Sequence, residues 1–178
     1  MDLLQKDGYI LRAPEPEDLA CMMQFENTPS LWEVGNVTGP YSRFFLKQYI
    51  ESTRNDIFAD NQLRLMIESP EKQVVGIIDL FNFEPFHNRA EVGIVVAKEC
   101  RQKGVGELAL RLLIAHSFDF LGLHQLYAHI DVTNEGCRRL FQKCGFEECG
   151  YLKDWMRTGK TFRDVVVMQL MASSTESA

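Results

Sequence analysis

The sequence lacks the features that mark membrane, secreted and metal-binding proteins. Its longest apolar run is much shorter than a membrane span, and its first residues form neither a basic segment nor a long apolar one. Its five cysteines include no C-x-x-C pair, and an odd number in a chain of 178 residues argues against a disulfide framework. The four histidines have no metal-ligand spacing. We therefore expect a cytoplasmic protein with reduced cysteines, no bound metal and no membrane contact.

Excess positive charge and the common nucleotide-binding signatures are also missing. The formal net charge is −6, which disfavours nucleic acid as a partner and favours cationic small molecules. Neither a Walker-type P-loop nor a three-glycine dinucleotide fingerprint is present, which disfavours the enzyme classes that use them. A composition of 46% hydrophobic and 25% charged residues fits one compact domain with a sizeable core.

The pattern along the chain predicts a mixed α/β (α+β) fold. Strand-like runs separated by turn-forming segments predict an antiparallel meander at 63–67, 74–83 and 90–96, and further strands at 9–11, 125–131 and 162–171. Apolar spacing predicts helices after Pro16, within 41–57, at 105–121 and after Asn134. In the last helix Phe141 points inward and Gly145 supplies the C-terminal cap. We expect a turn-rich, substrate-facing loop at 30–40 and a disordered tail at 172–178.

A basic, glycine-spaced segment follows the strand that ends at Val96. It opens the helix that begins near Val105, so its backbone N–H groups lie at the positive end of a helix dipole, which suits a phosphate or pyrophosphate. A Cβ at Gly104 or Gly106 would block the approach of an anion or resist a positive φ. This segment predicts a phosphorylated cofactor, and it consists of Arg101, Gln102, Lys103, Gly104, Val105, Gly106 and Glu107.

The order of these elements, followed by Asn134-x-x-Cys-x-x-x-Phe-x-Lys-Cys-Gly-Phe, resembles the GNAT N-acetyltransferase superfamily over residues 9–171. The segments 11–19 and 88–94 resemble its branch of ribosomal-protein N-terminal and spermidine/spermine acetyltransferases. The resemblance implies one domain with a splayed mixed sheet flanked by helices. It also implies transfer of an acetyl group from acetyl-CoA to a primary amine, by direct attack in a ternary complex. The acceptor would be polyamine-like or a protein N-terminus, and the chain would form a homodimer or a larger homo-oligomer.

The resemblance also assigns residues to the cofactor. The backbone of Ile94, Val95 and Val96 would contact the pantetheine arm, and residues 101–107 would hold the pyrophosphate. Asn134, with the helical turn after it, would contact the arm near the thioester.

Two catalytic positions follow. Glu91 is the preferred carboxylate for taking the proton of the amine, directly or through water; the alternative is a solvent-facing glutamate paired with Arg89. Phe141 stands where related enzymes often have a tyrosine that protonates the departing sulfur, and phenylalanine has no proton to give. Water, Tyr151 or Cys144 could replace it, or the thiolate could leave unaided. Otherwise the chain is an acyl-CoA-binding module or sensor with weak or lost turnover.

The acceptor site is the least defined part of the sequence. Spermidine acetyltransferases have acidic residues where this chain has Asn82 and the segment 35–38, so recognition of a polyamine by paired carboxylates is in doubt. Trp32 could cover an amine by a cation–π contact, and Tyr151 and Trp155 could line the cleft or form a dimer contact. The other acceptor-binding candidates are Glu26, Glu33, Asp79 and Glu84, for which ordinary surface charge is the alternative.

Overall fold

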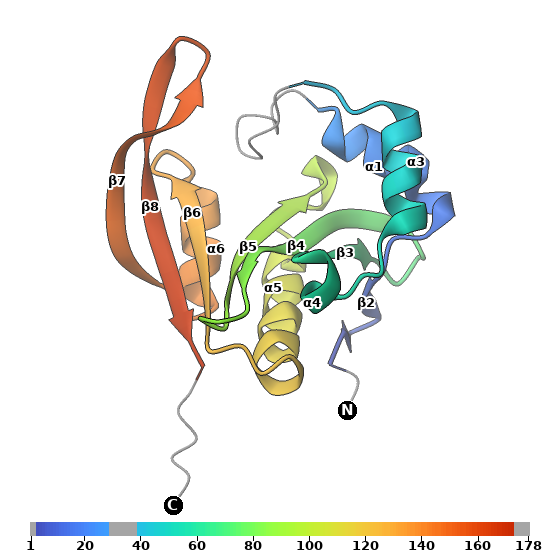
Figure 1. Ribbon diagram of the computed structural model, residues 1–178, viewed down its shortest axis with the longest axis horizontal. Helices are drawn as coiled ribbons and strands as arrows, with labels where there is room; N and C mark the ends of the chain where they lie inside the picture. Colours follow the sequence, from blue (N-terminus) through green and yellow to red (C-terminus); the bar gives the residue numbers. More distant parts are fainter. Residues whose placement is uncertain (1–2, 29–38, 173–178) are drawn as a thin grey trace, which may run out of the picture.

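The computed structural model describes residues 3–28 and 39–172, which fold around one sheet of eight strands (Figure 1). The strand order is β1-β2-β3-β4-β5-β6-β8-β7. The strands are β1 (Gln5–Lys6), β2 (Tyr9–Arg12), β3 (Leu63–Glu68), β4 (Val74–Glu84), β5 (Arg89–Val96), β6 (Gln125–Asp131), β7 (Glu147–Thr158) and β8 (Thr161–Met171).

The helices lie on both faces of this sheet. Helices α1 (Leu19–Glu26) and α3 (Arg43–Ser52) cover one face, and α5 (Val105–Ala115) and α6 (Glu135–Lys143) cover the other (Figure 1). Shorter turns are η1 (Pro16–Asp18), α4 (Ile57–Asp60), η2 (Lys98–Cys100) and a π-helical turn, η3 (His116–Phe120). Within the described ranges, no helix is long and apolar enough to cross a membrane.

Neighbouring strands β5 and β6 run parallel but stay together for only a short distance. Their register pairs Arg89 with Gln125, Ala90 with Leu126 and Glu91 with Tyr127. Beyond these pairs, β5 continues to Val96 on β4 alone and β6 continues to Asp131 on β8 alone. Every other neighbouring pair of strands is antiparallel. The predicted splayed mixed sheet is therefore confirmed, as is its antiparallel meander.

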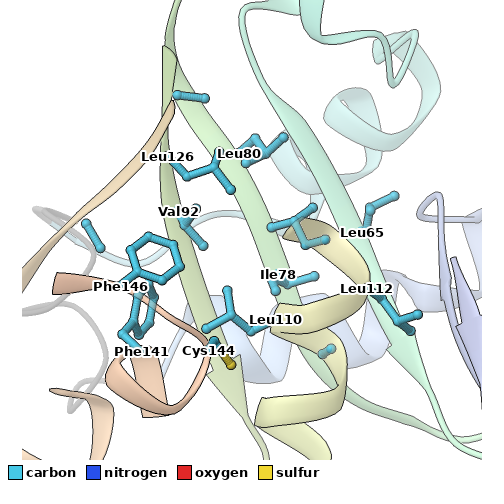
Figure 2. Packing of buried hydrophobic residues seen from close by; sticks show 14 of the residues in the cluster. Leu65, Ile78, Leu80, Val92, Leu110, Leu112, Leu126, Phe141, Cys144 and Phe146 are labelled. Carbon is cyan, nitrogen blue, oxygen red and sulfur yellow. The ribbon is translucent and has the colours of Figure 1, made fainter. Parts of the chain in front are cut away.

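Strict alternation of side chains builds two cores from the same strands. On β4, for example, Ile78 joins the cluster under α5 and α6, whereas Ile77 joins the cluster under α1 and α3. Figure 2 shows the first cluster, in which Leu110, Phe141 and Cys144 from the helical layer meet strand residues such as Val92. Because each face of β3 to β5 is sealed by a helical pair over part of its length, the rest of the sheet is left for polar side chains.

Two helix predictions are corrected. The predicted helix within 41–57 is two helices, because Ser42 Oγ accepts from Phe45 N and Asp56 Oδ1 accepts from Phe58 N, so each begins a separate helix. The predicted helix 105–121 leaves α-helical geometry at His116, one turn after Leu113, whose carbonyl is bonded by Ser117 Oγ. Strand β7 forms an antiparallel hairpin with the last strand, β8, and lies at the edge of the sheet.

Candidate active site

Glu91 is buried on the sheet face that turns away from α5 and α6. Only 8% of the residue is exposed, and both carboxylate oxygens are engaged. Oε2 accepts from Asn82 Nδ2 at 2.9 Å, and Oε1 lies 2.7 Å from His129 Nδ1. The alternative of a solvent-facing glutamate paired with Arg89 is wrong, because Arg89 binds Glu84 instead, with Nη2 to Oε1 at 2.8 Å. Glu91 is thus held in one position from two neighbouring strands.

A bulge in β4 brings Asn82 to Glu91. The register between β4 and β5 shifts between Phe81 and Glu84, and Asn82 has a positive φ of 47°. Asparagine tolerates this left-handed conformation better than most side chains, and a bulge re-aims the side chains of its strand. We predicted Asn82 as an acceptor-binding residue; in the structure its amide binds the Glu91 carboxylate.

Aromatic rings surround the histidine that contacts Glu91. The rings of His129 and Trp155 are stacked, with centroids 6.0 Å apart and planes 14° apart, and Tyr127 meets His129 edge-on at 5.7 Å. Burial and the nearby Glu91 carboxylate raise the pKa of Tyr127. Trp155 is 58% exposed and reaches His129 because the β7–β8 register shifts between Leu152 and Met156. The structure therefore places Trp155 beside His129, the partner of Glu91.

Sequence reasoning missed His129, which it considered only as a metal ligand. The signal was the alternation of β6, where Tyr127, His129 and Asp131 share one face. What it lacked was the pairing partner, because Glu91 is 38 residues away in the chain. Among the described residues, no group of three or more His, Cys, Asp or Glu side chains is arranged to hold a metal ion.

The basic segment 101–104 forms an exposed bend in front of α5. Gln102 and Gly104 have positive φ values of 61° and 83°, and Gly104 is the N-cap residue of α5. A Cβ on Gly104 would meet nothing within 4 Å, so the glycine is needed for its φ and for whatever approaches the backbone, not for packing within the chain. Alternating backbone conformations next to a helix N-terminus turn several N–H groups toward one point, which suits a diphosphate.

Other members of the segment have roles within the chain. Gly106 has no positive φ; a Cβ there would lie 3.2 Å from Leu140 Cδ2, so this glycine allows α5 to pack closely against α6. Arg101 Nε donates to Val96 O at 2.9 Å and ties the bend to the end of β5. Glu107 pairs with Arg111 within α5 at 3.0 Å, Val105 is buried, and Lys103 is exposed.

Ile94, Val95 and Val96 lie on the part of β5 that has left β6. Their partners on β4 are Ile78, Ile77 and Gly76, and the edge toward β6 pairs with no strand among the described residues. Asn134 is the N-cap of α6, where its Oδ1 accepts from Cys137 N at 3.2 Å. An open strand edge leading to a glycine-containing bend at a helix N-terminus fits the extended shape of acetyl-CoA, with a polar arm and a diphosphate.

Phe141 is not at the surface of the site. It is 1% exposed, and its ring meets that of Phe146 at 4.8 Å and 67° (Figure 2). Cys144 lies in the same cluster, and burial raises the pKa of its thiol to about 11. Tyr151 is exposed on β7 and donates to Asp164 Oδ2, a hydrogen bond that raises the pKa of Tyr151. Phe141 and Cys144 thus belong to the sheet face opposite Glu91.

The remaining acceptor-binding candidates are either ion-paired or outside the described residues. Arg64 binds Asp79, with Nη2 to Oδ2 at 2.8 Å, and Glu26, with Nη1 to Oε1 at 2.5 Å. Glu84 binds Arg89 as described above. These contacts hold α1 and the β4–β5 turn in place, so the three carboxylates have structural partners. The candidates that lie outside the described residues are Trp32, Glu33 and the loop that contains them.

The chain is similar in sequence to proteins of known family. Residues 9–147 match the model of the acetyltransferase (GNAT) domain. Spermidine N(1)-acetyltransferase of Vibrio cholerae is 29% identical over 164 residues, which cover 92% of each chain. A putative ribosomal N-acetyltransferase of Bacillus subtilis is 32% identical over 101 residues, which cover 57% of this chain and 55% of that protein.

Two solved structures of the Vibrio cholerae enzyme are similar throughout. The crystal structure in complex with CoA and spermine has a TM-score of 0.85 at 26% identity and covers 94% of this chain and 98% of that one. A dodecameric structure has a TM-score of 0.79 at 27% identity and covers 97% and 98% of the two chains. The splayed sheet, the bend before α5 and the α6 helix are therefore parts of a shared fold.

Proposed function

The chain belongs to the GNAT acetyltransferase family, and from this premise we propose that its acceptor is a polyamine. The enzyme is an acetyl-CoA-dependent N-acetyltransferase that transfers the acetyl group to an amine. The observation that carries the choice of acceptor is the buried Glu91 carboxylate, with the exposed ring of Trp155 nearby through His129. A carboxylate and an aromatic face both attract an ammonium group. The net charge of −6 adds long-range attraction for a polycation.

We propose that the cofactor residues divide into three groups along one path. The bend at 101–104 and the first turn of α5 hold the diphosphate, and the open edge of β5 at Ile94, Val95 and Val96 binds the pantetheine amides. Asn134 and the start of α6 lie near the reactive end. When bound, acetyl-CoA supplies an activated acetyl thioester. The edge N–H groups of β5 then stabilise the negative charge that develops on the acetyl oxygen.

Glu91 is the centre of the acceptor site. An amine attacks a thioester only in its neutral form, and the proton on its nitrogen must leave as the new N–C bond forms. A buried carboxylate with a fixed position draws the ammonium in and favours removal of that proton. Phe141 donates none, so the thiolate leaves as such; a thiol of ordinary pKa near 8.5 makes this feasible near neutral pH.

A second candidate is an acyl-CoA-binding module without turnover, and the buried Phe141 ring is the observation that favours it. A protein N-terminus as acceptor is supported by the similarity to the Bacillus subtilis protein. One experiment separates these possibilities. Release of CoA thiol is measured with spermine, spermidine, aminoglycosides, amino acids and ribosomal N-terminal peptides, and binding of CoA is followed by thermal shift.

The expected result is the highest kcat/KM with spermine or spermidine. A preference for peptides would overturn the polyamine assignment and leave acetyl transfer intact. Stabilisation by CoA without thiol release from any amine would support the binding module instead. No stabilisation by CoA would overturn the cofactor path along β5 and the bend.

We also propose that the chain forms a homo-oligomer. Strand β7 is a 12-residue edge strand with mostly exposed side chains, and an open edge of this length is a surface for pairing with another chain. Sedimentation velocity at micromolar concentration tests this. A monomer at all concentrations would overturn it.

A further inference from the structure

The two oxygens of Glu91 raise the question of which atom receives the proton of the amine. Oε2 is occupied by the Asn82 amide and Oε1 by His129 Nδ1, at 2.9 and 2.7 Å. We infer that His129 Nε2 is the proton acceptor and that Glu91 is a positioning residue that orients the imidazole. This inference rests on the proposed function, and it gives the two residues distinct roles within one site.

The contact with Glu91 sets the tautomer of His129. A carboxylate oxygen at 2.7 Å from Nδ1 favours the form with the proton on Nδ1, because Nδ1–H then donates to the negative charge. The lone pair of the neutral ring is left on Nε2, on the far side of the imidazole from Glu91. The same arrangement of carboxylate, imidazole and free Nε2 activates the nucleophile in serine hydrolases.

Exposure supports the same division of roles. The His129 side chain is 27% exposed, against 11% for the Glu91 side chain. His129 also lies further into the splayed part of the sheet, because β5 and β6 separate after the Glu91–Tyr127 pair and His129 is the next residue on that face of β6. An amine that attacks a thioester held along residues 92–96 of β5 therefore meets His129 before it can reach the Glu91 oxygens.

The surrounding rings keep His129 in one orientation and accommodate its charged form. Trp155 covers one face of the imidazole and Tyr127 contacts it edge-on. A stacked tryptophan stabilises a cation through its π face. Glu91 and Tyr127 are the ionisable groups next to His129, and the Asp131–Arg163 ion pair at 2.9 Å lies further along β6. Glu91 is the group in direct contact with His129.

The proton and electron balance is simple. The nitrogen lone pair of the neutral amine forms the N–C bond, and the N–H proton moves to His129 Nε2. The electron pair of the C–S bond leaves with the thiolate. The imidazolium then returns its proton to the thiolate or to water, which regenerates the neutral ring.

The test compares two variants that keep the shape of the site. In His129→Asn the amide takes the place of Nδ1 and can still donate to Glu91, but Nε2 is gone. In Glu91→Gln the carboxylate charge is gone and His129 remains. We expect His129→Asn to lower kcat at least about 100-fold, the usual contribution of a general base. The matched control is His124→Asn, at an exposed histidine outside the site, which should leave kcat unchanged.

The pH profile distinguishes a base from a structural residue. The acidic limb of kcat/KM in the wild-type enzyme should be lost in His129→Asn and kept in His124→Asn. Glu91→Gln keeps His129 and should therefore keep an acidic limb. Imidazole added to His129→Ala should restore activity in proportion to its neutral fraction. Each assay uses the amine that gives the fastest thiol release.

Other results would overturn the assignment of His129 as the proton acceptor. If Glu91→Gln abolishes turnover while His129→Asn keeps more than about a tenth of kcat, the carboxylate is the base and this inference is overturned. Lack of imidazole rescue together with an acidic limb that persists in His129→Asn would also overturn it. A wild-type enzyme that binds CoA but acetylates no amine would overturn the proposed function itself. An unchanged thermal shift with CoA in both variants shows that the cofactor path is intact.

Discussion

The two faces of the central strands differ in what they bury. Under α5 and α6 the buried side chains are aliphatic and aromatic, with Phe141 and Cys144 among them. On the other face, where β5 and β6 begin to separate, the buried group is the Glu91 carboxylate with amide and imidazole partners. Two residues adjacent in sequence lie on different faces: Val92 packs in the apolar core, and Glu91 lies in the polar group on the other face. The comparison indicates that stability and chemistry can be changed separately by choosing the face.

Leu110→Ala should have the largest effect, and it should be confined to stability. Leu110 has no exposed surface and lies in the middle of the apolar cluster. Removing its branched end should lower the free energy of unfolding by about 2–5 kcal/mol, measured by urea denaturation. The pH profile of kcat should not move. Leu110→Met, a volume-conserving control, should cost less than about 1.5 kcal/mol; equal losses would mean that packing does not determine this face.

Phe141→Tyr brings a hydroxyl into the apolar face at the position of the family tyrosine. We expect a loss of about 1–3 kcal/mol in unfolding free energy, since the hydroxyl enters an apolar cluster, and no change in the pH profile of kcat. Phe146→Tyr is the matched control, since Phe146 is the ring partner of Phe141. A gain in kcat with a new alkaline limb in Phe141→Tyr alone would show that this position does reach the leaving sulfur.

Gly104→Ala tests whether the bend at 101–104 binds the diphosphate. Gly159, in the β7–β8 turn, also has a positive φ and open space where a Cβ would point, so Gly159→Ala is a matched control for backbone strain. Each variant should lose roughly 1 kcal/mol of stability. Only Gly104→Ala should raise the KM for acetyl-CoA, by roughly tenfold, measured by steady-state thiol release. Equal KM values for the two variants would contradict diphosphate binding at the bend.

Trp155→Leu should have the smallest effect, and it should act on the acceptor. Loss of the stacked ring removes a contact worth about 0.5–1 kcal/mol at an exposed site, so kcat/KM for the amine should fall by a few-fold while the KM for acetyl-CoA stays the same. Phe162→Leu, an exposed ring on the same hairpin, should change neither constant. A larger effect at Phe162 would argue that the hairpin acts through its fold and not through Trp155.

Much of the fold was predictable because it depends on local pattern. The alternation in β3 to β6 predicted the strands within a few residues, and the spacing around Phe141 and Gly145 predicted an inward ring and a helix end, where Gly145 indeed has a φ of 95°. The helix within 41–57 was overextended because its apolar spacing continues past Ser52, whereas the caps at Ser42 and Asp56 decide where helices begin.

Only the parts of the candidate site that depend on local sequence were predictable. Glu91 and its face follow from alternation on one strand, and the bend at 101–104 follows from its glycines. His129, Asn82 and Trp155 come together through strand order, a bulge and a register shift, none of which has a signature in a single sequence. In the same way, the pairing of Glu26 and Asp79 with Arg64 appears only once α1 is placed on the sheet.

The brief pairing of β5 with β6 has a mechanical consequence. Three paired residues on each strand and the Glu91–His129 contact join the block β1–β5 to the block β6–β8, and both blocks pack on the helical layer of α5 and α6. Acetyl-CoA bound between β5 and β6, beyond their paired residues, would take the place of a strand and contact both blocks. Binding of the cofactor would then stabilise both blocks, and amide hydrogen exchange would slow in β6 and β8 as well as in β5.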